Sequence, residues 1–529
     1  MGWNFGDLFD GCGEVLAADT PALIHGDKIV TWGELTARSN NLARALLERG
    51  AVAGDKVAIY MRNCPEYMET LVACCKARLV PVNVNYRYRD DELHYILDNS
   101  DAVVAVYGAE FKVHIATLQT RLPDMHWIES GAPYERLVTA GSGAALDIER
   151  SGDDLVFIYT GGTTGMPKAV MWRQDDLWHA LGAGAGARCN LNVAPESPAQ
   201  HLENLRNYGR VFIQLVACPL MHGTGLLTSM SSLAGGGALV TLTGQRFDVE
   251  ELWHTVQRRE VNAVVIVGDA FATPMLNALE ENIGRWDISS LEVIISSGVM
   301  WSPPVKEGLL RHHSDMVLLD AFGSSEALGF GSAVSDGRSN TAVSTSARFA
   351  IGPGCKVFNE DFEEVRPGSG ARGFIARTGP IPLGYYKDDE KTATTFPTID
   401  GVRYSIPGDW CTVEVDGTLN LLGRGSACIN SAGEKIFPEE VEEALKTHAA
   451  VDDALVFGVD DKKWGQAVTA IVVFAEGEMA AIGELREHVH RLLAAYKSPK
   501  AIYAVDTIFR GENGKADYHA ARAYVANLN

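Results

Sequence analysis

The stretch DLVFIYTGGTTGMPKAVMW, residues 154–172, decides how the rest of the sequence is interpreted. Apolar runs flank a loop of glycines, threonines, a proline and Lys168, so the pattern predicts a strand–loop–strand turn. A Walker A loop ends in Gly-Lys-Ser/Thr and opens a helix, whereas Pro167 precedes the lysine here. Such a turn can still hold phosphate, because backbone N–H groups converge at glycines while threonine and lysine add donors and charge. From these residues alone, an ordinary Gly-Thr turn is the alternative.

The sequence on both sides of this loop indicates the fold class. Short runs rich in β-branched residues alternate with runs of helical spacing, which predicts α/β layers with mainly parallel strands. Later the sequence becomes Gly-rich, and Asp416-Gly417 between two alternating runs predicts a hairpin. A compact α+β tail follows, with a helix that starts at Pro438. We therefore expect a large N-terminal domain of layered α/β subdomains plus a β-rich subdomain, residues 1–423, and a small α+β domain, residues 424–529, joined by a hinge.

Composition narrows the function. The chain has 529 residues, 46% of them hydrophobic, and a formal net charge of −22, which disfavours nucleic acid and anionic membranes as partners. An anionic substrate therefore needs a local basic pocket. Nine scattered cysteines without a CxxC pair favour reduced thiols in a cytoplasmic protein over disulfides or a zinc site. No signal peptide is indicated at the N-terminus.

One segment has the length of a membrane span. Residues 211–245 contain no Asp, Glu, Lys or Arg. Pro219 and the triplet Gly235-Gly236-Gly237 interrupt this segment, and its two ends have the pattern of short strands. We therefore predict strands around a buried helix and no integral membrane segment, because such breaks would leave backbone groups unpaired in lipid.

Over essentially its full length the sequence resembles the adenylate-forming superfamily of acyl-CoA synthetases, adenylation domains and luciferases. Its signature loop, [ST]-[SG]-G-[ST]-[ST]-G-x-P-K-G, is matched by residues 160–169, with Ala169 at the last glycine. In the stretches YTGGTTGMPKAVMWR (159–173), IPLGYYKDDEKTATTF (381–396) and GVRYSIPGD (401–409) the sequence most resembles an actinobacterial branch of fatty acyl-CoA and steroid side-chain CoA ligases. Further matches follow in family order: DAFGSSE (320–326), YSIPGDW (404–410), GRGSACINSAGEK (423–435) and GENGKADY (511–518).

The resemblance implies a two-step ligase reaction that uses ATP, Mg²⁺ and, as co-substrate, CoA. It assigns catalytic roles to Lys515, which would bridge the carboxylate and the α-phosphate, and to Glu326 and Thr164, which would hold the metal. Phe322 would stack on adenine, and Asp409 would accept from both ribose hydroxyls. The implied ATP-binding set is Thr160, Gly161, Gly162, Thr163, Thr164, Gly165, Lys168, Ser297, Gly298, Asp320, Ala321, Phe322, Gly323, Ser324, Ser325, Asp409, Arg424 and Lys515.

Three further groups of residues concern the acid, the thiol and the hinge. The acyl pocket is expected to include His222, Gly223, Gly225, Asp269, Val299 and Met300. Because Asp269 is the only acid there, a hydrophobic carboxylic acid fits better than an amino acid, and medium- or long-chain fatty acids and steroid side-chain acids both stay open. By resemblance, Ser431, Ala432 and Gly433 would line the CoA channel and Ser426 would be the hinge residue.

Departures from the family pattern keep alternatives open. Ala169, Pro407 and the uncharged hinge around Ser426 allow a nucleotide-binding protein without turnover. An acyl-AMP ligase that loads a carrier protein, or a luciferase-like oxygenase, would share the first half-reaction. The ordinary structural interpretations are a helix N-cap at Ser324 or Ser325, with Glu326 in the first turn, and core or surface roles for His222 and Lys515. Homodimers are common in the family, and the sequence does not decide between monomer and dimer.

Overall fold

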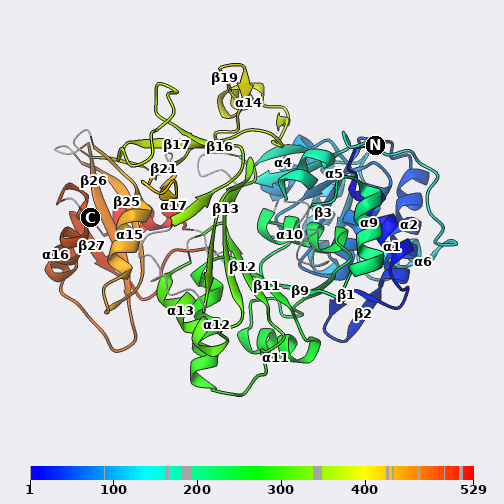
Figure 1. The fold of residues 1–529 in the computed structure, drawn as a ribbon. Coiled ribbons are helices and arrows are strands. Elements are labelled where there is room, and N and C mark those ends of the chain that lie inside the picture. Colours follow the sequence, from blue (N-terminus) through cyan, green and yellow to red (C-terminus); the bar gives the residue numbers. More distant parts are fainter. Residues whose placement is uncertain are drawn as a thin grey trace. The chain divides into compact units, whose positions relative to one another are not determined.

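The structure, a computed structural model, shows two compact units, each built from two stretches of the chain (Figure 1). Unit 1 comprises Met1–Val343 and Arg377–Ser405, and unit 2 comprises Ser344–Ala376 and Ile406–Asn529. The predicted boundary and hinge near residue 424 stay predictions. The structure describes residues 2–88, 90–160, 166–181, 194–299, 301–337, 348–424, 428–431, 434–461, 465–493, 495–511 and 516–528.

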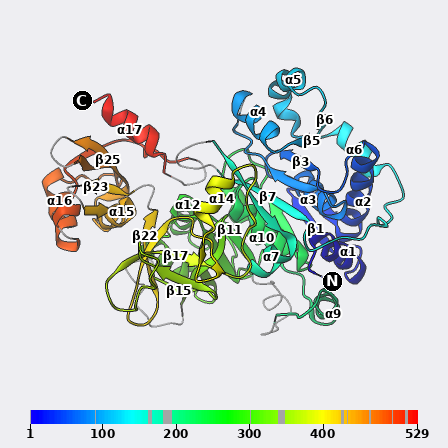
Figure 2. The ribbon, with the colours of Figure 1, turned by 90° about the horizontal axis from the view of Figure 1, so that it is seen from above.

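The first sheet of unit 1 contains, in spatial order, β18 (Gly384–Tyr385), β8 (Lys168–Arg173), β7 (Leu155–Thr160), β4 (Val80–Asn83), β3 (Lys56–Tyr60), β5 (Ala102–Tyr107) and β6 (His126–Glu129). The strands from β7 to β6 are parallel. Strand β8 runs antiparallel to β7, and β18 runs antiparallel to β8. The pairing of β7 with β8 confirms the predicted strand–loop–strand turn. Helices cover the sheet, and α2 lies beside α6 and α4 beside α5 (Figure 2). They are α2 (Trp32–Glu48), α3 (Pro65–Lys76), α4 (Asp90–Asn99), η1 (Ala109–Phe111), α5 (Lys112–Arg121) and α6 (Ala132–Thr139).

The second sheet of unit 1 runs through β2 (Lys28–Thr31), β1 (Pro21–His25), β10 (Ala238–Thr241), β9 (Ile213–Val216), β11 (Ala263–Ile266), β12 (Val293–Ser297), β13 (Val317–Ser324) and β14 (Ala327–Asp336). The strands from β1 to β13 are parallel, and β2 and β14 pair antiparallel at the two ends of this series. Its helices and the remaining elements of unit 1 are α1 (Phe5–Val15), α7 (Gln174–Ala180), α9 (Pro198–Tyr208), α10 (Gly223–Ala234), α11 (Val249–Arg259), α12 (Asp269–Glu281), α13 (Pro303–His312), α14 (Asp389–Thr395), β19 (Thr398–Ile399) and β20 (Val402–Arg403).

The charge-free segment at 211–245 forms the predicted strand–helix–strand unit. Strands β9 and β10 lie side by side in the second sheet, and α10 between them in sequence is largely buried. Leu226, Met230 and Leu233 belong to the main hydrophobic core, which also takes in residues of the first sheet. Within the part of the chain that the structure describes, no helix has the length and apolar character needed to cross a membrane.

Unit 2 contains two sheets. The first runs through β16 (Cys355–Phe358), β17 (Arg372–Arg377), β21 (Asp409–Val413), β22 (Leu419–Arg424) and β15 (Arg348–Ile351). Asp416-Gly417 joins β21 to β22, with Gly417 at φ +82°, which confirms the predicted hairpin. The second sheet runs through β24 (Glu434–Ile436), β23 (Ile429–Ser431), β26 (Gly465–Phe474) and β25 (Val451–Asp461), and β27 (Ala501–Ala504) pairs with β26. The helical elements are α15 (Pro438–Lys446), α16 (Ile482–Leu492), η3 (Ala495–Lys497) and α17 (Tyr518–Ala526).

The α/β fold class is confirmed by these layers, and so is the order of the α+β tail. The tail was predicted as helix, strand, strand, helix and strand, which α15, β25, β26, α16 and β27 follow. The short β23–β24 hairpin and α17 were not predicted. Only three residues form each of these two strands, and so short a run carries no usable periodicity.

Two asparagines, the buried Asn83 and the half-buried Asn63, connect the first sheet of unit 1 to the segment before α10. Asn83, at the end of β4, receives a hydrogen bond from the Tyr159 N–H (2.8 Å) and donates to the Met221 carbonyl (2.6 Å). Asn63 donates to the Cys218 carbonyl (2.9 Å) and accepts from the Leu220 N–H (2.8 Å). Each side-chain amide thus accepts from a backbone N–H and donates to a backbone carbonyl, as the backbone of a neighbouring strand would. They fix the end of β7 and the residues before His222 to the same framework.

Replacement of Asn83 by alanine should destabilise unit 1. The change leaves the buried Tyr159 N–H and Met221 carbonyl without these partners, which we expect to cost about 2–4 kcal/mol of unfolding free energy. Urea unfolding followed by tryptophan fluorescence measures this. Asn85→Ala is the matched control, because Asn85 accepts a local hydrogen bond from the Arg87 N–H, two residues away; equal losses in both variants would contradict the expectation.

Candidate active site

The carboxyl ends of β12 and β13 in unit 1 bring several of the predicted nucleotide-binding residues together. Ser297 is aligned with Ala321 in the parallel register, and Gly298 follows at φ +94°, a conformation that favours glycine. The Gly268 N–H donates to the Ser296 hydroxyl (2.9 Å), so the end of β11 is tied to the same point. Ligands of α/β proteins bind outside the carboxyl ends of parallel strands, which is where these residues lie.

The sequence GSSE forms the turn of a β-hairpin between β13 and β14. Ser324 pairs with Ala327 across the turn, so the alternative of a helix N-cap at Ser324 or Ser325 is wrong. That alternative rested on residue types common to both structures, and the antiparallel partner strand decides between them. Phe322 is largely buried, and its ring lies 5.3 Å from that of Phe330 between centroids.

Three hydrogen bonds hold this turn. The Trp172 indole N–H donates to the Ser325 carbonyl (2.9 Å), and the Ser405 hydroxyl donates to the Glu326 carbonyl (2.7 Å). The Tyr385 hydroxyl donates to Oε1 of the Glu326 carboxylate (2.8 Å). Glu326 is only 8% exposed, so its carboxylate is kept in a defined orientation inside the protein.

The start of α10 lies against the same turn. A Cβ on Gly223 would come within 3.4 Å of the Ser325 hydroxyl, and the Thr224 hydroxyl donates to the Ser297 carbonyl at 3.5 Å. At Gly225 a Cβ would lie 2.5 Å from the Pro219 carbonyl oxygen, so only glycine fits. The structure therefore brings together the predicted acyl residue Gly223 and the predicted nucleotide residues Ser297 and Ser325. His222 precedes α10 directly as its N-cap residue.

Asp320, a predicted nucleotide-binding residue, forms a buried ion pair. The Lys306 ammonium lies 2.9 Å from its Oδ2, and both side chains are less than 10% exposed. Burial raises the pKa of Asp320, an effect that Lys306 opposes and the nearby Asp269 carboxylate reinforces. Asp269 also accepts a hydrogen bond from the Ser302 N–H (3.0 Å). Both acids therefore already have protein partners.

Lys168, predicted to contact phosphate, forms an ion pair with Asp388. Asp388 also caps α14 by accepting from the Lys391 N–H (2.9 Å), and the hydrogen bond from Lys168 lowers the pKa of Asp388. Its side chain is 24% exposed and that of Lys168 is 39% exposed, so solvent reaches the pair. A small pocket of about 250 Å³ adjoins the pair, lined by Tyr95, Asn99, Met166, Lys168, Tyr386, Lys387 and Asp388.

In unit 2, Asp409 and Arg424 are aligned across β21 and β22. Asp409 is 7% exposed, and Ser431, predicted for the thiol channel, is buried in β23. The side chain of Arg424 lies outside the description, as do the predicted residues Gly161, Gly162, Thr163, Thr164, Gly165, Met300, Ser426, Ala432, Gly433 and Lys515.

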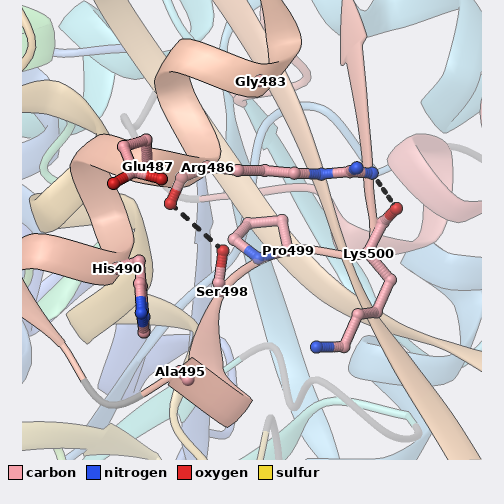
Figure 3. Close-up of a pocket in the computed structure, with 8 residues that line it drawn as sticks. All are labelled: Gly483, Arg486, Glu487, His490, Ala495, Ser498, Pro499 and Lys500. Carbon is pink, nitrogen blue, oxygen red and sulfur yellow. Dashed lines mark hydrogen bonds between the residues drawn. The ribbon is translucent and has the colours of Figure 1, made fainter.

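A cavity of about 410 Å³ lies beside α16 in unit 2. Figure 3 shows the Arg486 side chain reaching the Lys500 carbonyl, and the Ser498 hydroxyl donating to the Arg486 carbonyl (3.3 Å). None of the residues predicted for the site lines it. The lining residues are Gly483, Arg486, Glu487, His490, Ala495, Ser498, Pro499 and Lys500.

Several residues at the site were not predicted. Lys306 carries no local motif. Trp172 and Ser405 lie in stretches that were singled out, 154–172 and 404–410, but received no role, and only the tertiary structure brings them to the turn. Tyr385 and Asp388 belong to the sequence IPLGYYKDDEKTATTF (381–396), which contributed to the resemblance but received no role. That resemblance was the signal in the sequence that could have pointed to them.

Comparison with known proteins identifies the family. The AMP-binding enzyme family matches residues 15–386, and the AMP-binding enzyme C-terminal domain matches residues 440–515. The chain is 39% identical to a 3-oxocholest-4-en-26-oate–CoA ligase of Rhodococcus rhodochrous, over 99% of this chain and 96% of the relative. It is 40% identical, with the same two coverages, to a medium/long-chain-fatty-acid–CoA/3-oxocholest-4-en-26-oate–CoA ligase of Mycolicibacterium smegmatis.

A solved structure shows the same fold. ATP-bound MatB from Rhodopseudomonas palustris superposes with a TM-score of 0.82 at 22% identity, covering 99% of this chain and 100% of the other. The chain belongs to the AMP-binding enzyme family. Within that family it is an acid–thiol ligase.

Loss of Lys306 should destabilise unit 1 in a pH-dependent way. In Lys306→Met the Asp320 carboxylate stays buried without its cation, which we expect to cost about 3–5 kcal/mol at neutral pH. Burial already raises the folded-state pKa of Asp320 above its unfolded value, and loss of Lys306 raises it further. The folded variant therefore takes up a proton more readily, so the loss should be larger at pH 8 than at pH 5.

Urea unfolding of Lys306→Met at the two pH values tests this expectation. The double variant Lys306→Met/Asp320→Asn is the control, because it removes the buried charge together with its partner and should recover part of the stability. An equal loss at pH 5 and pH 8 would show that the ion pair is not the cause.

Proposed function

We propose that this ligase activates a hydrophobic carboxylic acid with ATP and transfers the acyl group to CoA. In the first step the acid carboxylate attacks the α-phosphorus of ATP, forming acyl-AMP and releasing pyrophosphate. In the second, the thiol attacks the acyl carbonyl, the thioester forms and AMP leaves. The main support is the identity of 39–40% over 99% of the chain with relatives named as CoA ligases.

The proposed substrates are medium- or long-chain fatty acids and steroid side-chain acids. The relative from Mycolicibacterium smegmatis is named for both classes of acid, and the relative from Rhodococcus rhodochrous is named for the steroid acid. A hydrophobic acid also agrees with the segments around His222, Asp269 and Val299, which are expected to line the acyl pocket. Their only acid, Asp269, accepts a hydrogen bond from the Ser302 N–H, so it already has a structural role in the free protein.

The protein contributes positioning and charge rather than covalent chemistry. Phe322 would stack on adenine, Asp409 and Arg424 would bind ribose, and Lys168 with Thr163 and Thr164 would hold the outer phosphates. Lys515 would neutralise charge between the carboxylate and the α-phosphate. Support for the first role comes from unit 1, where Ser297, Ala321 and Ser325 lie near the end of β13, the strand that carries Phe322.

Mg²⁺ is the proposed metal. The Glu326 carboxylate fits it, because Mg²⁺ prefers oxygen ligands and this carboxylate is both buried and oriented by a hydrogen bond. Thr164 would be the second protein ligand. When bound, the ion would neutralise phosphate charge. We also propose a cytoplasmic location, which agrees with the finding that no disulfide joins the described cysteines.

The substrate proposal predicts a defined set of products. With ATP, Mg²⁺ and CoA, long-chain fatty acids and steroid side-chain acids should give acyl-CoA and AMP, detected by mass spectrometry. Short polar acids should react poorly, because their polar groups lose hydration in an apolar pocket. Pyrophosphate exchange without any acyl-CoA formation would instead indicate a carrier protein as acceptor. Nucleotide binding without AMP release from any acid would contradict catalysis altogether.

Lys515→Ala should separate the two half-reactions. Removal of a charge that acts at the reacting phosphate should slow acyl-AMP formation by about 100-fold or more. Transfer from preformed acyl-AMP to CoA should be unchanged. Pyrophosphate exchange measures the first step, and Lys500→Ala, another lysine of unit 2, is the control. An undiminished exchange rate would remove Lys515 from the mechanism.

A further inference from the structure

Residues 383–388 form a short edge segment that joins two charged side chains of the proposed ATP site. Strand β18 pairs antiparallel with β8, the strand that leaves the 161–165 loop, and Tyr385 is aligned with Val170. The Leu383 N–H donates to the Met171 carbonyl (2.9 Å) and the Tyr386 N–H to the Ala169 carbonyl (2.9 Å). These main-chain bonds attach the segment to the base of the loop.

Tyr385 is rigidly placed in this segment. Its N–H donates to the Thr392 hydroxyl (2.8 Å), and its ring packs edge-on against Phe396 at 5.9 Å between centroids. At Gly384 a Cβ would lie 2.4 Å from the Thr392 methyl carbon, so a glycine is needed for this close approach. With 5% of its surface exposed, Tyr385 is held by its backbone, by its ring and by the hydroxyl bond to Glu326.

The same segment contacts the second charged group. Asp388, three residues after Tyr385, pairs with Lys168 at the other end of the loop. The segment therefore reaches Glu326 through a tyrosine hydroxyl and Lys168 through a carboxylate. Lys168 is proposed to hold the outer phosphates of ATP. Its pair with Asp388 therefore places Tyr385 near the phosphate end of the proposed site, independently of Glu326.

We propose that Tyr385 is a positioning residue for the metal–nucleotide complex, and that its hydroxyl orients the Glu326 carboxylate toward the ion that accompanies ATP. The inference rests on the proposed role of Glu326. A carboxylate oxygen that accepts one hydrogen bond keeps further lone pairs, so Glu326 can bind Tyr385 and a cation together. Partners of this kind hold metal-binding carboxylates in place, and their loss typically lowers metal affinity by about 10- to 100-fold.

Isothermal titration calorimetry of the full-length protein tests this inference. Tyr385→Phe should weaken binding of ATP in the presence of Mg²⁺ by about 10-fold or more. It should leave binding of ATP with EDTA unchanged, because the phenyl ring keeps its packing. A parallel loss in both conditions would reduce Tyr385 to a packing residue and overturn the inference.

Tyr386→Phe is the matched control. This neighbouring tyrosine also donates its hydroxyl to a carboxylate, but the acceptor is Asp101 Oδ2 (2.6 Å) and not Glu326. Loss of a tyrosine–carboxylate bond here should leave the Mg²⁺ dependence unchanged. Melting temperatures of both variants confirm that each is folded. The same selective loss in Tyr386→Phe would assign the effect to the whole segment and contradict a specific role of Tyr385.

Glu326→Gln separates this inference from the function on which it depends. If Glu326→Gln loses the Mg²⁺ dependence of ATP binding and Tyr385→Phe does not, the positioning role fails and the metal role stands. If Glu326→Gln keeps the wild-type dependence, the proposed metal role itself fails. We expect both single variants to show the loss, and the double variant to show little more than Glu326→Gln alone, since the two side chains act as a unit.

Discussion

The turn at Ser325 and Glu326 depends on three neutral hydrogen-bond donors that come from separate parts of unit 1. Trp172 follows the 161–165 loop on β8, Tyr385 lies on the neighbouring edge strand, and Ser405 comes from the end of the unit's second stretch. A buried carboxylate next to unpaired backbone groups would be costly, so these bonds are needed for the turn to exist in this form. Because the donors come from β8, from β18 and from Ser405, the turn depends on the packing of all three segments.

Charge is distributed locally in a chain that is strongly acidic overall. With a net charge of −22, an anionic ligand is repelled at long range, and only nearby cations can offset this. The Lys306–Asp320 pair is buried, so each charge is neutralised by the other, and loss of either partner would destabilise the fold. The Lys168–Asp388 pair is partly exposed, and pairs of that kind contribute about 0–1 kcal/mol. Loss of the Asp388 partner would therefore cost little, which is what the proposed phosphate contact of Lys168 requires.

Much of the fold could be predicted from local patterns. The strand–loop–strand turn, the buried helix between β9 and β10, the Asp416-Gly417 hairpin and the order of the α+β tail all follow from periodicity and turn chemistry. The GSSE stretch shows the limit of such reasoning. Its residue types suit a helix N-cap as well as a hairpin turn. The choice depends on β14, which pairs with β13 at seven positions from Val317 to Ser324.

For the site, the sequence by itself determined which residue types were present and in which order: the loop around Lys168, the turn with Glu326 and the aspartate at 409. Motif spacing carries this information because the residues within each motif follow one another along the chain. Only the tertiary structure decided which groups hold them. Asn83, Lys306 and Tyr385 act on residues 76, 14 and 59 positions away, respectively, and a hydrogen bond across such a distance leaves no periodic trace in the sequence. Each of these bonds exists only once the chain segments that carry its two residues have packed together.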